Sequence, residues 1–404
     1  MKIVYFAILD DLDPYIGVLK KIKSQTQGLK NNGVIINTYI FYSKGSLREL
    51  NDNIFYKYIK RPEKKVPFTG IILEFLHKKA IFRAINNLIK ESKFDIIYFR
   101  YPFSDYNSYK LVKKNKGKVV FEHNTKELEE LNLTLRPSII KIFKLREKLF
   151  AALSFKYLGG IVGCSTDFVA HQQEKVNYKL RNTIAISNGI NVETVPIRDI
   201  PPFNGKDINV LFAANISNWH GFDRLLNGFK KYDGETNYKF YLLGNKNLFE
   251  KEISRFDFSN NKIAALKLEG FINGSLINEY FNNCHIAIGS LGLHRLGIIN
   301  GVPLKHREYI ARGIPFVYSG NDQDLPSGNT IESYLMKITP DESFIDFYKV
   351  DEFVRNIYCL SGYSSKMRAF AIENLDWNIK MKLLKSFLEN VDKKFEDTVG
   401  RYSE

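Results

Sequence analysis

The residues best suited to bind a phosphorylated sugar lie between Cys284 and Gly320. Two apolar runs, 285–288 and 314–318, predict buried strands at either end of this stretch. The loop after the first strand is rich in glycine, so its backbone N–H groups can approach a phosphate without obstruction by side chains. A short helix is predicted from Pro303 to Gly313, with proline in its first turn and glycine just past its end.

That predicted helix carries three charged side chains near its start. Lys305 and Arg307 supply positive charge, and Glu308 supplies a carboxylate suited to two neighbouring sugar hydroxyls. Strand, glycine loop, helix and strand together predict a βαβ unit, in which ligands bind at the carboxyl ends of the strands. The alternative interpretation is an ordinary βα turn followed by a salt-bridged helix.

One histidine and two acidic segments are further candidates for catalysis or for metal binding. His123 ends a predicted strand, 118–124, at the edge where sites of parallel sheets form. The acidic segment 10–14 is interpreted as a solvated loop, and Asp322-Gln323-Asp324 as a turn. We therefore predict no metal site.

The surrounding chain alternates between predicted strands and helices, first over residues 1–187 and again from 208 onward. The most proline-rich segment, 196–205, separates the two alternations and is interpreted as a linker. The predicted fold class is α/β, with two Rossmann-like doubly wound domains facing each other across a cleft. The first domain covers 1–195 and is completed by a last helix at about 377–395, and the second covers 206–376.

Composition excludes several classes of protein. The chain has 404 residues, of which 44% are hydrophobic and 25% charged, as expected for a folded protein with more than one domain. It has no apolar run long enough to cross a membrane. Three scattered cysteines lack metal-binding spacing and fit a reducing cytosol. The net charge of +15 has no nucleic-acid motif beside it and is more consistent with an anionic membrane surface or a phosphorylated ligand.

These patterns resemble the GT-B glycosyltransferases, and within them the retaining glycosyltransferase family 4, in the form found in bacterial surface-polysaccharide synthesis. The resemblance is strongest over 183–320: Asn188-Gly189 looks like the family's turn near the linker, and residues 308–316 (EYIARGIPF) look like its E-A-M-A-x-G-x-P-V element. The chain departs from the family at Asn300, where the first of two glutamates is usual. His220 stands where lysine is usual and Asn215 where arginine is usual; Arg224 is interpreted as a substitute.

The resemblance implies a nucleotide-sugar donor, and a saccharide or lipid-linked saccharide as acceptor. It assigns catalytic roles to His123, Glu308 and Lys305. The donor-binding residues that we predict are Gly17, Asn215, His220, Arg224, Ser290, Gly292, Arg295, Asn300, Gly301, Val302, Pro303 and Leu304. No cofactor, metal or nucleic acid is expected. The expected location is the cytoplasm, with peripheral attachment to the inner face of the plasma membrane. The alternatives are another GT-B nucleotide-sugar protein, such as an epimerase or phosphorylase, and a non-catalytic binding protein.

Overall fold

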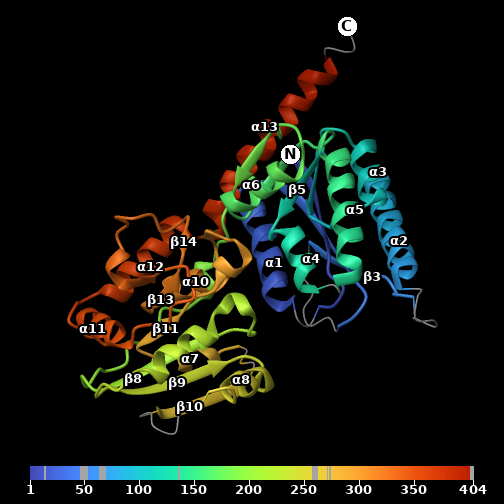
Figure 1. Ribbon diagram of the computed structural model, residues 1–404. Coiled ribbons are helices and arrows are strands. Elements are labelled where there is room, and N and C mark those ends of the chain that lie inside the picture. Colours follow the sequence, from blue (N-terminus) through green and yellow to red (C-terminus); the bar gives the residue numbers. More distant parts are fainter. Residues whose placement is uncertain are drawn as a thin grey trace. The chain divides into compact units, whose positions relative to one another are not determined.

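The computed structural model places the chain in two compact units (Figure 1). It describes residues 1–12, 15–45, 53–62, 70–134, 137–256, 263–270, 272 and 274–400, so Asp13 and Pro14 of the acidic segment lie outside the described residues. Unit 1 consists of residues 1–187 together with the last helix from Trp377, and unit 2 consists of 188–376. Each unit is described by itself.

Unit 1 contains a parallel sheet whose described strands follow the order β3-β2-β1-β4-β5-β6-β7. The chain moves outward from β1 in one direction, then returns to β4 and moves outward in the other direction. The elements of this unit are β1 (Lys2–Ile8), α1 (Ile16–Asn31), β2 (Ile35–Tyr42), β3 (Ile54–Tyr58), α2 (Gly70–Glu91), β4 (Ile96–Arg100), α3 (Tyr106–Lys114), β5 (Val119–His123), α4 (Glu127–Thr134), α5 (Pro137–Phe155), β6 (Gly160–Gly163), α6 (Thr166–Lys175), β7 (Thr183–Ala185) and α13 (Trp377–Gly400).

Both faces of this sheet are buried, which explains why its strands are apolar at nearly every position. Tyr5 of β1 faces α1 and α13, whereas its neighbour Phe6 faces α2, α3 and α5. Helix α13 contributes Trp377, Met381, Leu384, Leu388 and Val391, spaced three or four residues apart and almost fully buried. Their burial contributes on the order of 10 kcal/mol to unit 1, taking roughly 2 kcal/mol for each side chain.

Unit 2 repeats the same logic with a second parallel sheet, whose described strands follow the order β10-β9-β8-β11-β13-β15. Its elements are β8 (Asp207–Ala213), α7 (Phe222–Lys230), β9 (Asn237–Leu243), α8 (Lys246–Ile253), β10 (Ile263–Gly270), α9 (Leu276–Asn283), β11 (Ile286–Ile288), β12 (Asn300–Gly301), α10 (Leu304–Arg312), β13 (Phe316–Ser319), β14 (Asn321–Asp322), β15 (Leu335–Ile338), α11 (Phe347–Tyr358) and α12 (Tyr363–Asn374), with short 3-10 helices at 192–194, 218–220, 293–296 and 332–334. The predicted helix within 303–313 is confirmed as α10.

The boundary between the units differs from the predicted linker. Unit 2 begins at Asn188, before the proline-rich segment. Arg198 of that segment is buried, and its guanidinium donates to the carbonyl of Gly313 at 3.1 Å and to the hydroxyl of Tyr363 at 2.7 Å. These hydrogen bonds make the proline-rich segment part of unit 2.

Candidate functional site

The candidate site of unit 2 is the point where the strand order reverses, between β8 and β11. These strands pair in parallel, with Val210 opposite Ile286 and Leu211 opposite Ala287. From β8 the chain proceeds to β9 and β10 on one side, and from β11 to β13 and β15 on the other. Open α/β sheets bind ligands outside the carboxyl ends of two such strands.

The loops that leave β8 and β11 are joined by their backbones. Leu291 N–H donates to the carbonyl of His220 at 3.2 Å, and Gly292 N–H donates to that of Trp219 at 3.1 Å. A Cβ atom on Gly292 would lie 2.6 Å from the carbonyl oxygen of Asn218, and one on Gly221 would lie 2.7 Å from Leu291 Cβ. Gly221 also has a φ of +64°. Glycine at both positions therefore permits this contact, which holds the two loops in one arrangement.

Lys305 lies beneath these loops in the first turn of α10. Its ammonium group donates to the carbonyl of Gly289 at 3.4 Å and lies 5.1 Å from the centre of the Phe212 ring. Burial lowers the pKa of Lys305 to about 7. In the part of the chain that the structure describes, no carboxylate pairs with this ammonium group, so its charge can interact with a phosphate.

His220 contributes a hydrogen-bonding group, but no charge, to the candidate site of unit 2. Its Nδ1 accepts the backbone N–H of Ser217 at 3.1 Å, so the ring proton resides on Nε2. Burial and the nearby charge of Lys305 lower the pKa of His220 to about 2. The expectation that His220 takes the place of a family lysine is therefore corrected: it supplies a neutral N–H donor.

Arg224, the predicted substitute cation, is also corrected by its surroundings. Its guanidinium is 1% exposed and donates to the carbonyls of Ser343, Leu291 and Thr339. These bonds occupy the donors that a phosphate would need. Arg224 thus fixes the 291 loop from below, and its role is structural.

Glu308 lies one turn after Lys305 on α10 and is oriented by Arg312. The Nε of Arg312 donates to Glu308 Oε1 at 3.0 Å, and Arg312 also lies 4.2 Å from the ring of Phe281. The Glu308 side chain remains 33% exposed. Its carboxylate is therefore held in one direction while part of it stays accessible to a ligand.

A buried polar layer supports α10 and the glycine loop. The sequence analysis did not single out His306, and it assigned the charge of Arg307 to a ligand. His306 Nε2 accepts the backbone N–H of Ser290 at 3.2 Å, and its Nδ1–H donates to Asp322 at 3.2 Å. Arg307 is fully buried, donates to both oxygens of Asp322 and to Asp324, and contacts the carbonyl of Asn188 at 3.0 Å. The signal was the placement of His306 and Arg307 between apolar helix positions.

This layer explains the Asp322-Gln323-Asp324 segment, which the sequence analysis interpreted as a turn. Both of its carboxylates are hydrogen-bonded to Arg307. Desolvation raises the pKa of Asp322, but the charge of Arg307 and the bond from His306 outweigh it and hold that pKa well below its usual range. Within the described ranges, no group of three or more histidine, cysteine, aspartate or glutamate side chains is placed to hold a metal ion.

The remaining predicted donor residues of unit 2 lie in the loops and short strands between β8 and α10. Arg295 is bound by Asp223 at 2.7 Å, by Glu342 and by the carbonyl of Asn218 at 2.9 Å. Asn300 and Gly301 form β12, which pairs with β14. The carbonyl of Val302 accepts from Asn188 at 2.8 Å. Asn215 is exposed in the loop after β8, and Pro303 and Leu304 form the start of α10.

Two predicted site residues lie in unit 1 instead. Gly17 is exposed near the start of α1, with no atom near the position of a Cβ. His123 is fully buried, its ring centre lies 4.1 Å from that of Tyr101 with the ring planes tilted by 35°, and its Nδ1 bonds to Glu127 at 2.5 Å. The role of His123 at a sugar stays a prediction; in the structure its side chain is fully buried within unit 1.

No protein-family model matches the chain, and no curated protein matches it in sequence. Solved structures do match its fold over nearly their whole length. The lipopolysaccharide outer core galactosyltransferase WaaB is 15% identical, with a TM-score of 0.64 over 96% of this chain and 99% of WaaB. Sucrose-phosphate synthase from Thermosynechococcus elongatus is 10% identical, with a TM-score of 0.63 over 97% of this chain and 99% of that enzyme.

A third match is Anabaena HepE, solved in complex with UDP and glucose. It is 12% identical, with a TM-score of 0.62 over 96% of this chain and 100% of HepE. At these identities the likeness concerns the fold. The predicted GT-B fold class is confirmed in that the chain forms two parallel-sheet α/β domains like those of glycosyltransferase structures.

Proposed function

We propose that the chain is a glycosyltransferase that takes its sugar from a nucleotide-sugar donor bound to unit 2. The observation that carries the proposal is Lys305, a half-buried lysine at the switch point of the sheet, whose ammonium group donates to the Gly289 carbonyl and has no carboxylate partner among the described residues. The diphosphate of the donor would accept hydrogen bonds from loop N–H groups and from Lys305, which would stabilise the leaving group. Glu308 would bind the ribose hydroxyls. The binding of UDP and glucose by HepE, a protein of the same fold, supports this class of donor.

The finer features of the proposal follow from the resemblance in sequence. We propose a saccharide or lipid-linked saccharide acceptor, retention at the transferred carbon, and a role in surface-polysaccharide synthesis. The charge of Lys305 would perform the task that a divalent metal performs in other transferases, so we propose activity that is independent of metal. Chelation by EDTA should leave turnover unchanged.

The alternative proposal, a non-catalytic or epimerase-like nucleotide-sugar protein of this fold, is favoured by Asn300. An amide at this position hydrogen-bonds but carries no charge, and so lacks the electrostatic role of a glutamate. Turnover separates the two proposals, because a binding protein would bind the donor without releasing nucleoside diphosphate.

The test of the main proposal is release of nucleoside diphosphate from a panel of nucleotide-sugars. We expect turnover with at least one donor, and a fall of about 10²–10³-fold in the rate for Lys305→Ala. Glu308→Ala should raise the KM for the donor. Lys206→Ala, which removes an exposed lysine from the same unit, is the matched control and should have no effect. Absence of both turnover and nucleotide binding across the panel would exclude the proposal.

We also propose that unit 1 attaches to an anionic membrane through α5. Along one side of this helix Ile142, Leu145 and Leu149 are 63%, 70% and 53% exposed, at a spacing that places them on one face. Lys141 and Lys148 are exposed beside them. Apolar side chains flanked by lysines are typical of helices that lie in the interface of an anionic bilayer. Within the described part of the chain, no helix is long and apolar enough to cross a membrane.

A further inference from the structure

Unit 1 contains a pocket of about 400 Å³ that the donor proposal does not use. Its walls come from the carboxyl ends of β1, β4 and β5 and from α2, α4 and α5. The pocket therefore occupies the switch point of the first sheet, where β1 and β4 are paired and their loops diverge. Its volume is that of a site for a small ligand such as one or two sugar rings.

Two of the acidic side chains that line this pocket are already neutralised. Glu122 is bound by Lys21 at 3.2 Å, Gln25 at 2.7 Å and Tyr5 at 2.9 Å. Desolvation raises the pKa of Glu122, but Lys21, Arg100 and these hydrogen bonds outweigh it and hold the pKa at about 2. Glu127 is likewise held by His123, Lys175 and Gln172.

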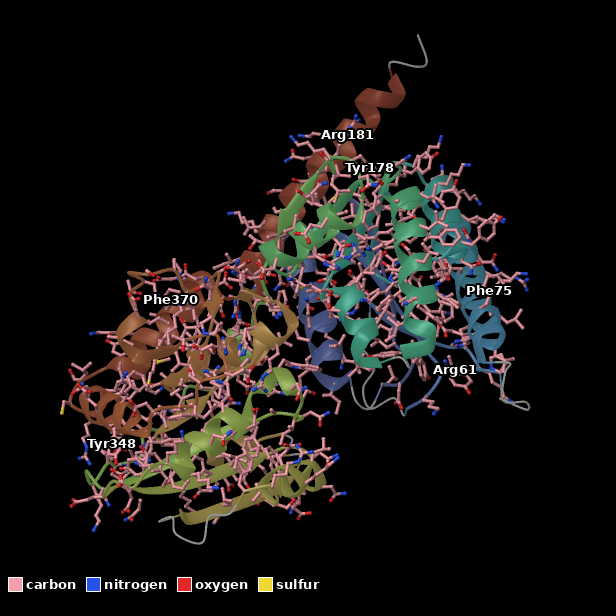
Figure 2. All side chains as sticks on the ribbon, in the orientation of Figure 1. Arg61, Phe75, Tyr178, Arg181, Tyr348 and Phe370 are labelled. Carbon is pink, nitrogen blue, oxygen red and sulfur yellow. The ribbon has the colours of Figure 1, made fainter. Side chains whose placement is uncertain are left out.

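Two of the basic side chains in the pocket are also paired. Lys78 contacts Asp105 at 3.2 Å and donates to the carbonyl of Phe103 at 2.7 Å. At the rim, Arg61 lies 3.6 Å from Asp10, and both side chains are well exposed; Arg61 is labelled in Figure 2. Three charged residues of the pocket wall remain, one of which also acts electrostatically on Glu122.

The three are Arg100, Arg146 and Glu74. Arg100 closes β4, and Arg146 lies in the middle of α5 with its guanidinium 4.4 Å from the ring of Phe143. Within the described part of the chain, Arg100 Nη1 and Arg146 Nε are buried N–H groups without a hydrogen-bond partner. Each such group costs on the order of 1–3 kcal/mol, and native proteins retain few of them without a reason. Arg100 and Arg146 therefore both bring a guanidinium group to the wall of this pocket.

We propose that this pocket binds a saccharide through an acidic group, a carboxylate or a phosphate, which Arg100 and Arg146 recognise. Guanidinium groups match both anions in geometry and charge, and the Phe143 ring orients Arg146 in advance. The exposed ring of Tyr15 at the rim offers an apolar face to the sugar. The inference rests on the proposed function in one respect, which is that the ligand is the acceptor of the transferred sugar.

The test measures binding to the full chain by calorimetry, with glucuronate for the carboxylate, glucose 1-phosphate for the phosphate, and glucose and inorganic phosphate as references. We expect one acidic sugar to bind more tightly than either reference. Arg100→Gln and Arg146→Gln should each weaken it by about 10–100-fold, the loss of charge-assisted hydrogen bonds. Arg146→Lys, which keeps the charge, should weaken it less. Arg83→Gln, an exposed site on α2, should have no effect.

Thermal unfolding of each variant verifies that it is folded, and UDP binding separates this inference from the proposed function. Variants that lose the acidic sugar but keep UDP affinity would support the inference. It is overturned if neither acidic sugar binds the wild-type chain, if the arginine variants bind it equally well, or if inorganic phosphate binds as tightly. Failure of UDP binding alone would remove the proposed donor function and leave the pocket result intact.

Discussion

At the scale of single residues, the candidate site depends on how burial changes ordinary side chains. Lys305 is ordinary in sequence, yet its surroundings lower its pKa to about 7. His220 is a neutral donor for the same reason. The candidate site of unit 2 therefore carries few charges. The protonation of Lys305 depends on the ligand, since an incoming phosphate would favour the protonated lysine.

This sensitivity predicts a pH dependence of nucleotide binding. A bound diphosphate should raise the pKa of Lys305, so that UDP binding takes up protons between pH 7 and 8. The affinity for UDP should fall as the pH rises from 7 to 9. Calorimetry in two buffers of different ionisation enthalpy measures the proton uptake. Lys305→Met should abolish the uptake, and an equal uptake in this variant would contradict the assignment.

The same lysine affects the stability of the free protein, with the sign set by its lowered pKa. An unfolded chain holds this proton up to a pKa of roughly 10.4, whereas the folded chain loses it near pH 7. Between these values the unfolded state binds more protons, so the contribution of Lys305 to the free energy of unfolding rises with pH. Below pH 7 its buried charge is a constant cost.

At the scale of elements, helices present different faces to the core and to solvent, and α5 is the informative example. Its inward residues Ala151 and Phe155 pack under the sheet, while Ile142, Leu145 and Leu149 face outward. Packing within unit 1 does not explain why these apolar side chains lie on the outer face of α5, and an exposed apolar face of this kind is typical of an interaction surface.

The membrane proposal predicts that this outer face controls binding to lipid vesicles. Leu145→Gln combined with Leu149→Gln should weaken binding to phosphatidylglycerol vesicles by about 10-fold or more, because each leucine contributes roughly 1.5–3 kcal/mol when buried. Leu360→Gln, an exposed leucine of unit 2, is the control. Sedimentation with vesicles measures the effect. Unchanged sedimentation of the double variant would exclude α5 as the attachment site.

At the scale of the whole molecule, the chain leaves unit 1 at residue 188, builds unit 2, and returns to unit 1 with α13. This last helix packs against α1, where Gly28 allows the two helices to approach: a Cβ there would lie 3.0 Å from the carbonyl oxygen of Trp377. Unit 1 is therefore completed by residues nearly 200 positions away from the rest of its sequence.

Adjacent leucines in α13 provide the test of this arrangement. Leu384 is fully buried in the unit 1 core and Leu383 is 51% exposed. Leu384→Ala should lower the free energy of unfolding by about 2–5 kcal/mol, whereas Leu383→Ala should change it by less than roughly 0.5 kcal/mol. Denaturant unfolding followed by circular dichroism measures both. Equal effects of the two substitutions would contradict the placement of α13.

The sequence by itself determined the two β/α alternations and the short helix after the glycine loop, and it singled out Lys305 and Glu308 as candidate site residues. These features depend on local periodicity and on spacing along the chain, which are visible without coordinates. Only the tertiary structure decided what the polar residues between them do. His123 and Arg224 are core residues, and His306 and Arg307 form the layer beneath the site. The physical reason is that burial and the choice of partner depend on contacts between segments distant in sequence. The pairing of β1 with β4 and of β8 with β11 creates the switch points of the two sheets, and it is likewise a property of the folded sheets.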